Sequence, residues 1–81
     1  MIKNEQIEQC LKSLPGVDDV KVSGDGYHYK LTIVSDIFLG KTKILRQQWV
    51  YAQLKEYIIS GELHALSMNT LTKDEWEASR G

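Results

Sequence analysis

Hydrophobic positions near the start of the chain recur at helical intervals. Their spacing of three and four residues predicts one apolar face of a helix, formed by Ile7, Cys10, Leu11 and Leu14. Asn4 precedes this face and is a good N-cap residue. Pro15-Gly16 follows it and is typical of a helix end. The first predicted element is therefore a short amphipathic helix.

The next segment changes to the two-residue period of β-strands. Val20 and Val22 alternate with polar residues, and after a turn the alternation resumes with Tyr27, Tyr29, Leu31 and Ile33. The turn itself is Ser23-Gly24-Asp25-Gly26, which is rich in turn-forming residues. This pattern predicts a β-hairpin with one buried face, to which all four of the later apolar residues contribute.

A helical period then returns for the longest predicted element. Its apolar positions are Leu45, Trp49, Val50, Leu54, Tyr57 and Ile58. The helix is expected to run to Ser60-Gly61, where the glycine can adopt the left-handed cap conformation. A third strand follows, with His64, Leu66 and Met68 alternating with Ala65, Ser67 and Asn69.

The chain ends in a short predicted helix. Thr72-Lys73-Asp74-Glu75 has the Thr-x-x-Glu form of a capping box and precedes Trp76. The order of elements is thus α-β-β-α-β-α, and we expect an α+β fold in one domain spanning residues 1–81. The pattern leaves open whether the third strand runs parallel or antiparallel to the hairpin.

Composition narrows the function classes. A chain of 81 residues has room for one core and no deep cleft between domains. It has no apolar run of about 20 residues and no apolar centre of a signal peptide, so we expect a cytoplasmic protein without a membrane segment. Ten Lys and Arg against 11 Asp and Glu give a net charge of -1, without the basic excess that is usual for nucleic-acid binding.

Five stretches, in this order and spacing, resemble the BolA-like family, in particular a bacterial subgroup with Gly-Asp-Gly-x-His at the hairpin. They are Val22-Ser23-Gly24-Asp25-Gly26-Tyr27-His28-Tyr29, Phe38-Leu39-Gly40-Lys41, Gln48-Trp49-Val50-Tyr51, His64-Ala65-Leu66-Ser67-Met68 and Asp74-Glu75-Trp76. The resemblance covers roughly residues 2 to 77. It implies a fold like a class II KH domain, a three-stranded sheet with helices on one face.

The resemblance also implies a function. Members of the family are understood to bind monothiol glutaredoxins, to share a glutathione-ligated [2Fe–2S] cluster with them, and to act in iron–sulfur trafficking or in iron and stress sensing. Some are described as DNA-binding regulators. Arg46-Gln47-Gln48 departs from the Arg-His-Arg of these regulators, which weakens the transfer of DNA binding, and Thr72 lacks the proline that usually follows it.

Two histidines are the candidate metal ligands. The resemblance places the metal-binding histidine of the family at His64, and a second histidine or a cysteine at His28. Without the resemblance, His64 is better explained as a partly buried histidine bonded to a carbonyl, and the resemblance reverses this preference. His28 is explained equally well as a solvated hairpin residue. We expect His64, at the head of a strand, to be the better fixed of the two rings.

Other candidates are weaker. Cys10 lies on the inner face of the first helix, where a thiol is usually an inert core residue. Lys41, Lys43 and Arg46 are candidates for a partner or nucleic-acid surface, or for a plain solvated face. The loop Gly24-Asp25-Gly26 has no phosphate-binding context, and the long helix is not preceded by Gly-x-x-Gly.

No catalytic constellation is found, so we interpret the chain as non-enzymatic. The preferred hypothesis is an adaptor that docks a monothiol glutaredoxin and supplies histidine to a shared cluster, with no cofactor expected in the isolated protein. The alternative is a KH-like nucleic-acid-binding transcriptional regulator that uses the edge around Lys41, Lys43 and Arg46.

Overall fold

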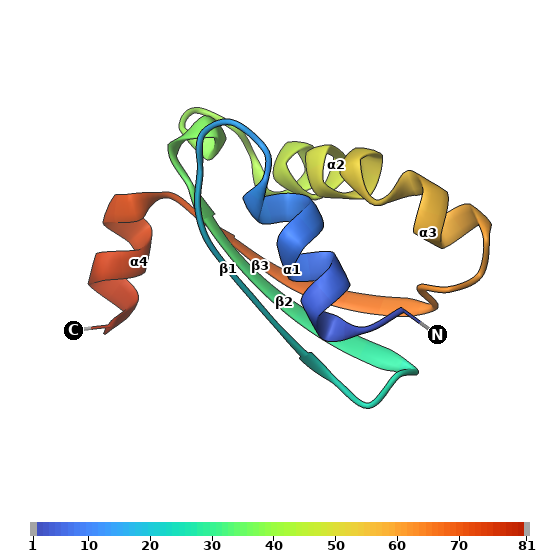
Figure 1. The fold of residues 1–81 in the computed structure, drawn as a ribbon. Coiled ribbons are helices and arrows are strands. Elements are labelled where there is room, and N and C mark those ends of the chain that lie inside the picture. The colour runs from blue at the N-terminus through green and yellow to red at the C-terminus, as the bar shows by residue number, and fades with distance from the viewer. Residues whose placement is uncertain (1, 81) are drawn as a thin grey trace.

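The computed structural model describes residues 2–80 and has the α+β architecture that the sequence predicts. Figure 1 shows the elements in chain order. They are α1 (Asn4–Lys12), β1 (Val17–Gly24), β2 (His28–Ser35), the 3₁₀ turn η1 (Asp36–Phe38), α2 (Lys43–Gln53), α3 (Lys55–Ile59), β3 (Ala65–Leu71) and α4 (Lys73–Arg80).

The three strands form one mixed sheet in the order β1-β2-β3. β1 and β2 are the antiparallel arms of the predicted hairpin. β3 pairs with β2 in parallel, which settles the question that the sequence pattern left open. A parallel pair requires a crossover connection, and here the segment that contains α2 and α3 supplies it.

The core lies between the sheet and three of the helices. The central strand β2 contributes Tyr29, Leu31 and Ile33, all almost completely buried. They pack with Ile7 and Leu11 of α1 and with Val50 and Leu54 of the α2–α3 segment. Alternation on β2 and helical spacing on α1 thus bring their apolar faces together, as expected for amphipathic elements.

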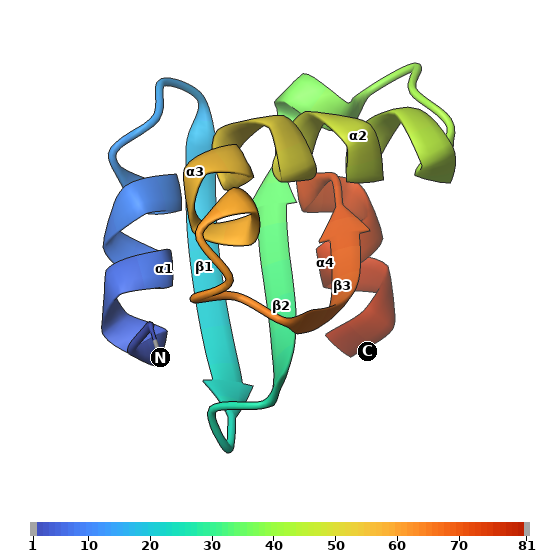
Figure 2. The same ribbon diagram turned by 90° about the vertical axis from the view of Figure 1, so that its right-hand side faces the viewer.

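The helices do not all lie on one face of the sheet. α1, α2 and α3 cover one face, whereas α4 lies behind the sheet, on the side of β3 that faces away from α2 (Figure 2). The expectation of helices on one face therefore holds for the first three helices only. α4 follows β3 after a single residue, Thr72, and turns to the opposite face.

The long predicted helix is divided into two. Leu54 has φ -103° and ψ 11°, outside the helical range, and separates α2 from α3. Its side chain is fully buried, so the bend keeps Leu54 in the core while α3 turns toward the start of β3. The predicted end is correct, because Gly61 follows α3 with φ +82°.

Two further details differ from the sequence prediction. Asn4 is the first residue of α1, and the N-cap is Lys3, whose backbone N–H donates to Gln6 Oε1 at 3.0 Å. Tyr27 is 70% exposed, although its place in the alternation predicted burial. It belongs to the turn and precedes β2, where no helix covers the hairpin.

Within residues 2–80, no helix combines the length and apolar character that crossing a bilayer requires.

Candidate histidine site at one end of the sheet

The hairpin turn determines where β2 begins. The Asp25 carboxylate accepts hydrogen bonds from the backbone N–H groups of Tyr27 and His28, both at 3.0 Å. Both bonds favour the ionised carboxylate and lower the pKa of Asp25 below its ordinary value. The bond from the His28 N–H has the larger effect. The turn is thereby closed on the residue that carries the first candidate imidazole.

Gly24 makes this turn sterically possible. Its φ is +154°, and a Cβ at this position would press against the His28 carbonyl oxygen and lie 3.0 Å from Tyr29 Cα. Only glycine fits so close an approach of two backbone segments. The Gly24-Asp25 pair therefore sets the position of the His28 backbone, through the close approach at Gly24 and the hydrogen bond to the Asp25 carboxylate.

The His28 ring reaches across to the neighbouring strand. Its Nε2 atom lies 2.8 Å from Ser67 Oγ of β3, within normal hydrogen-bond distance. Both side chains are exposed. Ser67 was predicted only as a polar position of the third strand, and sequence reasoning gave no signal that it would contact a histidine.

His64 lies at the same end of the sheet. His28 is the register partner of Ala65, the residue that follows His64, and Ala65 N–H donates to the Tyr27 carbonyl oxygen at 3.3 Å. Leu63 is buried and its N–H donates to the Tyr57 carbonyl at 3.1 Å, which ties down the chain just before His64. The parallel pairing thus brings two distant, exposed histidines to neighbouring positions.

The two rings differ in their hydrogen bonds. His28 has a side-chain hydrogen bond across the sheet, whereas the His64 ring makes none to the other described residues. His64 also precedes β3 instead of opening it. Hydrogen bonding alone gives no support to the expectation that His64 is the better-fixed ring, which stays a prediction.

The described residues offer few metal ligands at this site. Neutral imidazole is a good ligand for transition metals, and two such rings lie at this end. Among residues 2–80, however, no cluster of three or more His, Cys, Asp or Glu is placed to hold a metal ion. Cys10 packs against the core from α1 and is half-buried. The described residues thus place two exposed imidazoles at this end of the sheet without a third ligand beside them.

Arg46 is not a surface cation. It is only 9% exposed, and its guanidinium donates to the carbonyl oxygens of Lys41 at 2.9 Å and Thr70 at 3.0 Å. It also forms an ion pair of 2.7 Å with Glu75. Its inclusion in a partner or nucleic-acid surface was therefore wrong, because the side chain is buried and all three guanidinium nitrogens make hydrogen bonds within the fold.

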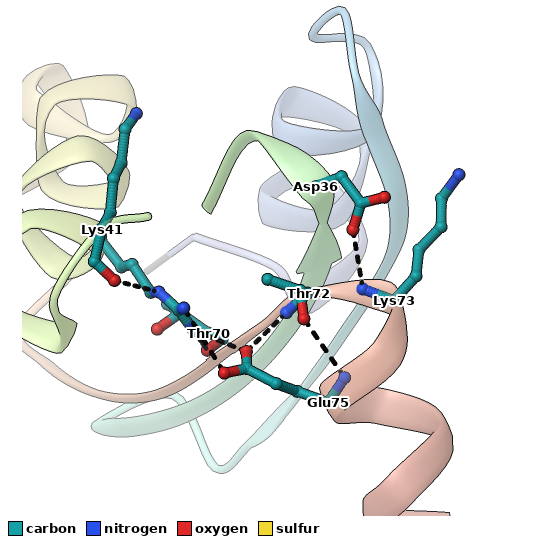
Figure 3. Close-up of polar contacts among 7 residues, drawn as sticks. Asp36, Lys41, Thr70, Thr72, Lys73 and Glu75 are labelled. Atoms are coloured by element: carbon teal, nitrogen blue, oxygen red, sulfur yellow. Dashed lines mark hydrogen bonds and ion pairs between the residues drawn. The ribbon is translucent and has the colours of Figure 1, made fainter. Parts of the chain in front are cut away.

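The carboxylate of Glu75 joins this ion pair to the predicted capping box. It accepts the Thr72 N–H at 2.8 Å, while the Glu75 N–H donates to Thr72 Oγ1 at 3.2 Å (Figure 3). The Arg46 side chain foremost, and then the Thr72 N–H, hold the pKa of Glu75 at about 2. Lys73 N–H donates to Asp36 Oδ1 at 3.0 Å and completes the attachment of α4.

Of the three predicted cations, two remain accessible. Lys43 is exposed and Lys41 is half-buried. They stand near the start of α2, apart from the histidine end of the sheet. The structure does not bring the basic and histidine candidates into one site.

A second exposed surface was missed by the sequence analysis. Tyr51, Ile58 and Ile59 are exposed apolar residues on the α2–α3 segment, and a shallow groove there also contacts Gln48, Ala52 and Lys55. Ile58 was assigned to the buried stripe, but the bend at Leu54 turns it partly outward. The run Tyr57-Ile58-Ile59 was the available signal, since three consecutive apolar residues cannot all face the core from one helix.

The structure described so far is a small α+β domain with two exposed histidines at one end of its sheet. Comparison with known proteins agrees with this class: the model of the family described as BolA-like protein matches residues 7–75. The chain belongs to the BolA-like family, as its resemblance predicted.

Individual relatives cover nearly the whole chain. The acid stress protein IbaG of Escherichia coli K12 is 35% identical over 79 residues, which are 98% of this chain and 94% of the relative. A bolA homologue from Coxiella burnetii has a TM-score of 0.82 at 32% identity, over 95% of this chain and 99% of that one. The BolA domain of SufE1 from Arabidopsis thaliana has a TM-score of 0.75 at 33% identity, over 89% and 93% respectively.

Proposed function

We propose that this protein is a non-enzymatic adaptor that docks a monothiol glutaredoxin and contributes histidine to a [2Fe–2S] cluster shared with that partner and glutathione. The observation that supports this most directly is the neighbouring position of His28 and His64, both exposed at one end of the sheet. Because both imidazoles are exposed at the same end of the sheet, a cluster that is also bound by a second molecule can reach them.

The need for a partner follows from ligand number. A [2Fe–2S] cluster has four protein-derived ligand positions, normally thiolates, and histidine substitutes for cysteine in some clusters. This chain offers two imidazoles there and no thiolate. In the proposed complex the glutaredoxin cysteine and glutathione supply the remaining ligands, and the shared cluster supplies the iron that is stored, sensed or transferred.

The chain's own residues bind and orient. The Asp25 turn positions His28, and the bond from Leu63 to Tyr57 positions the segment before His64. We place the exchange in the cytoplasm, where thiols and glutathione stay reduced. The name of the Escherichia coli relative, an acid stress protein, supports a role during stress.

Anaerobic reconstitution with a monothiol glutaredoxin and glutathione tests the proposal, with visible circular dichroism as the readout. The wild-type mixture is expected to give a cluster spectrum that differs from that of glutaredoxin alone. His64→Ala is expected to abolish or strongly destabilise this mixed cluster, since the resemblance makes His64 the principal ligand. His28→Ala is expected to weaken the cluster or change its spectrum without preventing docking.

Lys30→Ala is the matched control, because Lys30 is an exposed residue on the same face of β2, two positions after His28. It should leave the spectrum and lifetime of the cluster unchanged. A wild-type-like cluster in His64→Ala would refute the assignment of the principal ligand. A spectrum of the wild-type mixture identical to that of glutaredoxin alone would refute the adaptor function.

The free protein is expected to bind no metal tightly, because two imidazoles form an incomplete site. Elemental analysis of the purified protein after chelator treatment measures this. A stoichiometric metal that resists the chelator would contradict the prediction.

A further inference from the structure

We propose that Ser67 is the positioning residue for His28. In this arrangement the Ser67 hydroxyl oxygen accepts the Nε2–H of His28 and leaves the lone pair of Nδ1 free for iron. The inference rests on the proposed function and adds to it the ligating atom and the residue that orients it.

The contact joins two strands. His28 is the first residue of β2, and its register partner on β3 is Ala65, so Ser67 stands two residues further along β3 on the same face. The Nε2–Oγ distance of 2.8 Å requires the ring to lean along β2 and across to β3. The bond therefore restricts both side-chain torsions of an otherwise exposed imidazole.

The backbone of His28 is held independently. Asp25 Oδ1 accepts its N–H at 3.0 Å, and the close approach at Gly24 leaves this segment little freedom. His28 is thus held at two points, its backbone N–H by Asp25 and its ring Nε2 by Ser67. A side chain held in this way is pre-organised. Pre-organised ligands lose less conformational entropy when they bind.

The chemistry of imidazole decides the direction of the bond. A neutral ring has one N–H and one lone pair, and Ser Oγ can either donate or accept. If Ser67 donated to Nε2, the proton would sit on Nδ1 and neither nitrogen would be free for a metal. If Ser67 accepts, Nδ1 is free, and the ring donates its other N–H to a fixed acceptor as metal-bound histidines generally do.

The first test uses the metal-free protein alone. Long-range ¹H–¹⁵N correlation spectra identify the protonated ring nitrogen of His28, and three-bond couplings report its χ1 rotamer. In the wild type we expect the Nε2–H form and a single χ1 rotamer. Ser67→Ala should give rotamer averaging at His28, whereas Ser67→Thr, which keeps the hydroxyl, should retain the wild-type couplings. A dominant Nδ1–H form, or unchanged couplings in Ser67→Ala, would overturn the inference.

The second test measures the lifetime of the cluster reconstituted with glutaredoxin and glutathione. Ser67→Ala should shorten the lifetime by about tenfold, a typical effect of removing an outer hydrogen-bond partner, and Ser67→Thr should restore it. In a His28→Ala background the Ser67→Ala substitution should have no additional effect, because Ser67 acts through the missing ring. Far-ultraviolet circular dichroism verifies that each variant is folded.

The outcomes separate the two proposals. If the wild type assembles a mixed cluster and Ser67→Ala has the same lifetime, the role of Ser67 is refuted and the adaptor function stands. If Ser67→Ala shortens the lifetime equally in the His28→Ala background, Ser67 acts elsewhere and the inference fails. If the wild-type mixture forms no mixed cluster, the proposed function fails and the ligand role of Nδ1 fails with it.

Discussion

At the scale of single residues, the Glu75 carboxylate connects two kinds of interaction. It caps the start of α4 through the Thr72 N–H and pairs with the Arg46 guanidinium. Its side chain is still 46% exposed, so solvent screens part of the attraction. The low pKa of Glu75 couples the stability of the fold to pH.

Glu75→Gln should lower the free energy of unfolding at pH 7 by about 1 kcal/mol, after allowance for screening and loss of the capping carboxylate. Because the folded pKa is about 2, below the ordinary value of 4.5, the stabilisation by the ionised group is complete above that ordinary value. It is lost as the pH falls toward 2. Urea unfolding across this range should therefore show the difference between wild type and variant shrinking with acid.

Glu77→Gln on the same helix is the control, since Glu77 has only an exposed contact of 3.5 Å with Arg80. Its effect should stay within about 0.5 kcal/mol at every pH. A difference between wild type and Glu75→Gln that grows in acid would contradict the assigned shift.

Gly24 is the second residue with a defined consequence. Gly24→Ala places a methyl group against the His28 carbonyl, so we expect a loss of about 2–3 kcal/mol in unfolding free energy and a displaced His28. Gly61→Ala is the control: its φ is +82°, but no atom lies within 4 Å of the added Cβ. That substitution should cost only about 1 kcal/mol of backbone strain. If Gly24→Ala and Gly61→Ala lowered the unfolding free energy equally, the protein would have relieved the contact with the His28 carbonyl, and the prediction would be wrong.

At the scale of elements, Arg46 connects α2 with β3 and α4. It extends from α2 to the Thr70 carbonyl at the end of β3 and to Glu75 of α4. The Phe38 ring lies 5.8 Å from its guanidinium carbon and provides an apolar surface below the charge. This side chain therefore links α2 to β3 and α4.

Arg46→Ala should destabilise the protein by about 3 kcal/mol, because it leaves a carboxylate and two carbonyls without their partner. Arg46→Lys should recover only part of the loss, since an ammonium cannot donate in three directions from a planar fork. Lys43→Ala, an exposed position of the same helix, should change stability by about 0.5 kcal/mol or less. Chemical denaturation of the three variants measures this, and similar stability of Arg46→Ala and Lys43→Ala would refute the connecting role.

At the scale of the whole molecule, charge argues against the nucleic-acid alternative. The net charge is -1, and burial of Arg46 removes one of the three candidate phosphate contacts. We expect weak or absent DNA binding at physiological salt. Electrophoretic retardation of a DNA duplex measures it, and any binding at low salt should disappear as salt increases and be weaker in a Lys41→Ala/Lys43→Ala variant. Sub-micromolar, sequence-selective retardation at physiological salt would instead favour a regulator.

Local features of this fold were predictable from the sequence. The hairpin around Gly24-Asp25-Gly26, the capping box of Thr72 and Glu75 and the end of α3 at Gly61 all appear where the pattern indicated. Each depends on residues within a few positions of one another, or on the period of apolar side chains. The two histidines were identified from a family resemblance, and their role remains a prediction.

The tertiary structure alone decided the arrangement of these parts. Parallel pairing of β3 brought His28 beside His64 and within reach of Ser67, and it placed the Thr70 carbonyl where Arg46 is buried. Contacts of this kind join residues that are far apart in the chain. Their geometry depends on the path of the α2–α3 crossover and on which polar groups find partners away from water, and neither is encoded in a local period of the sequence.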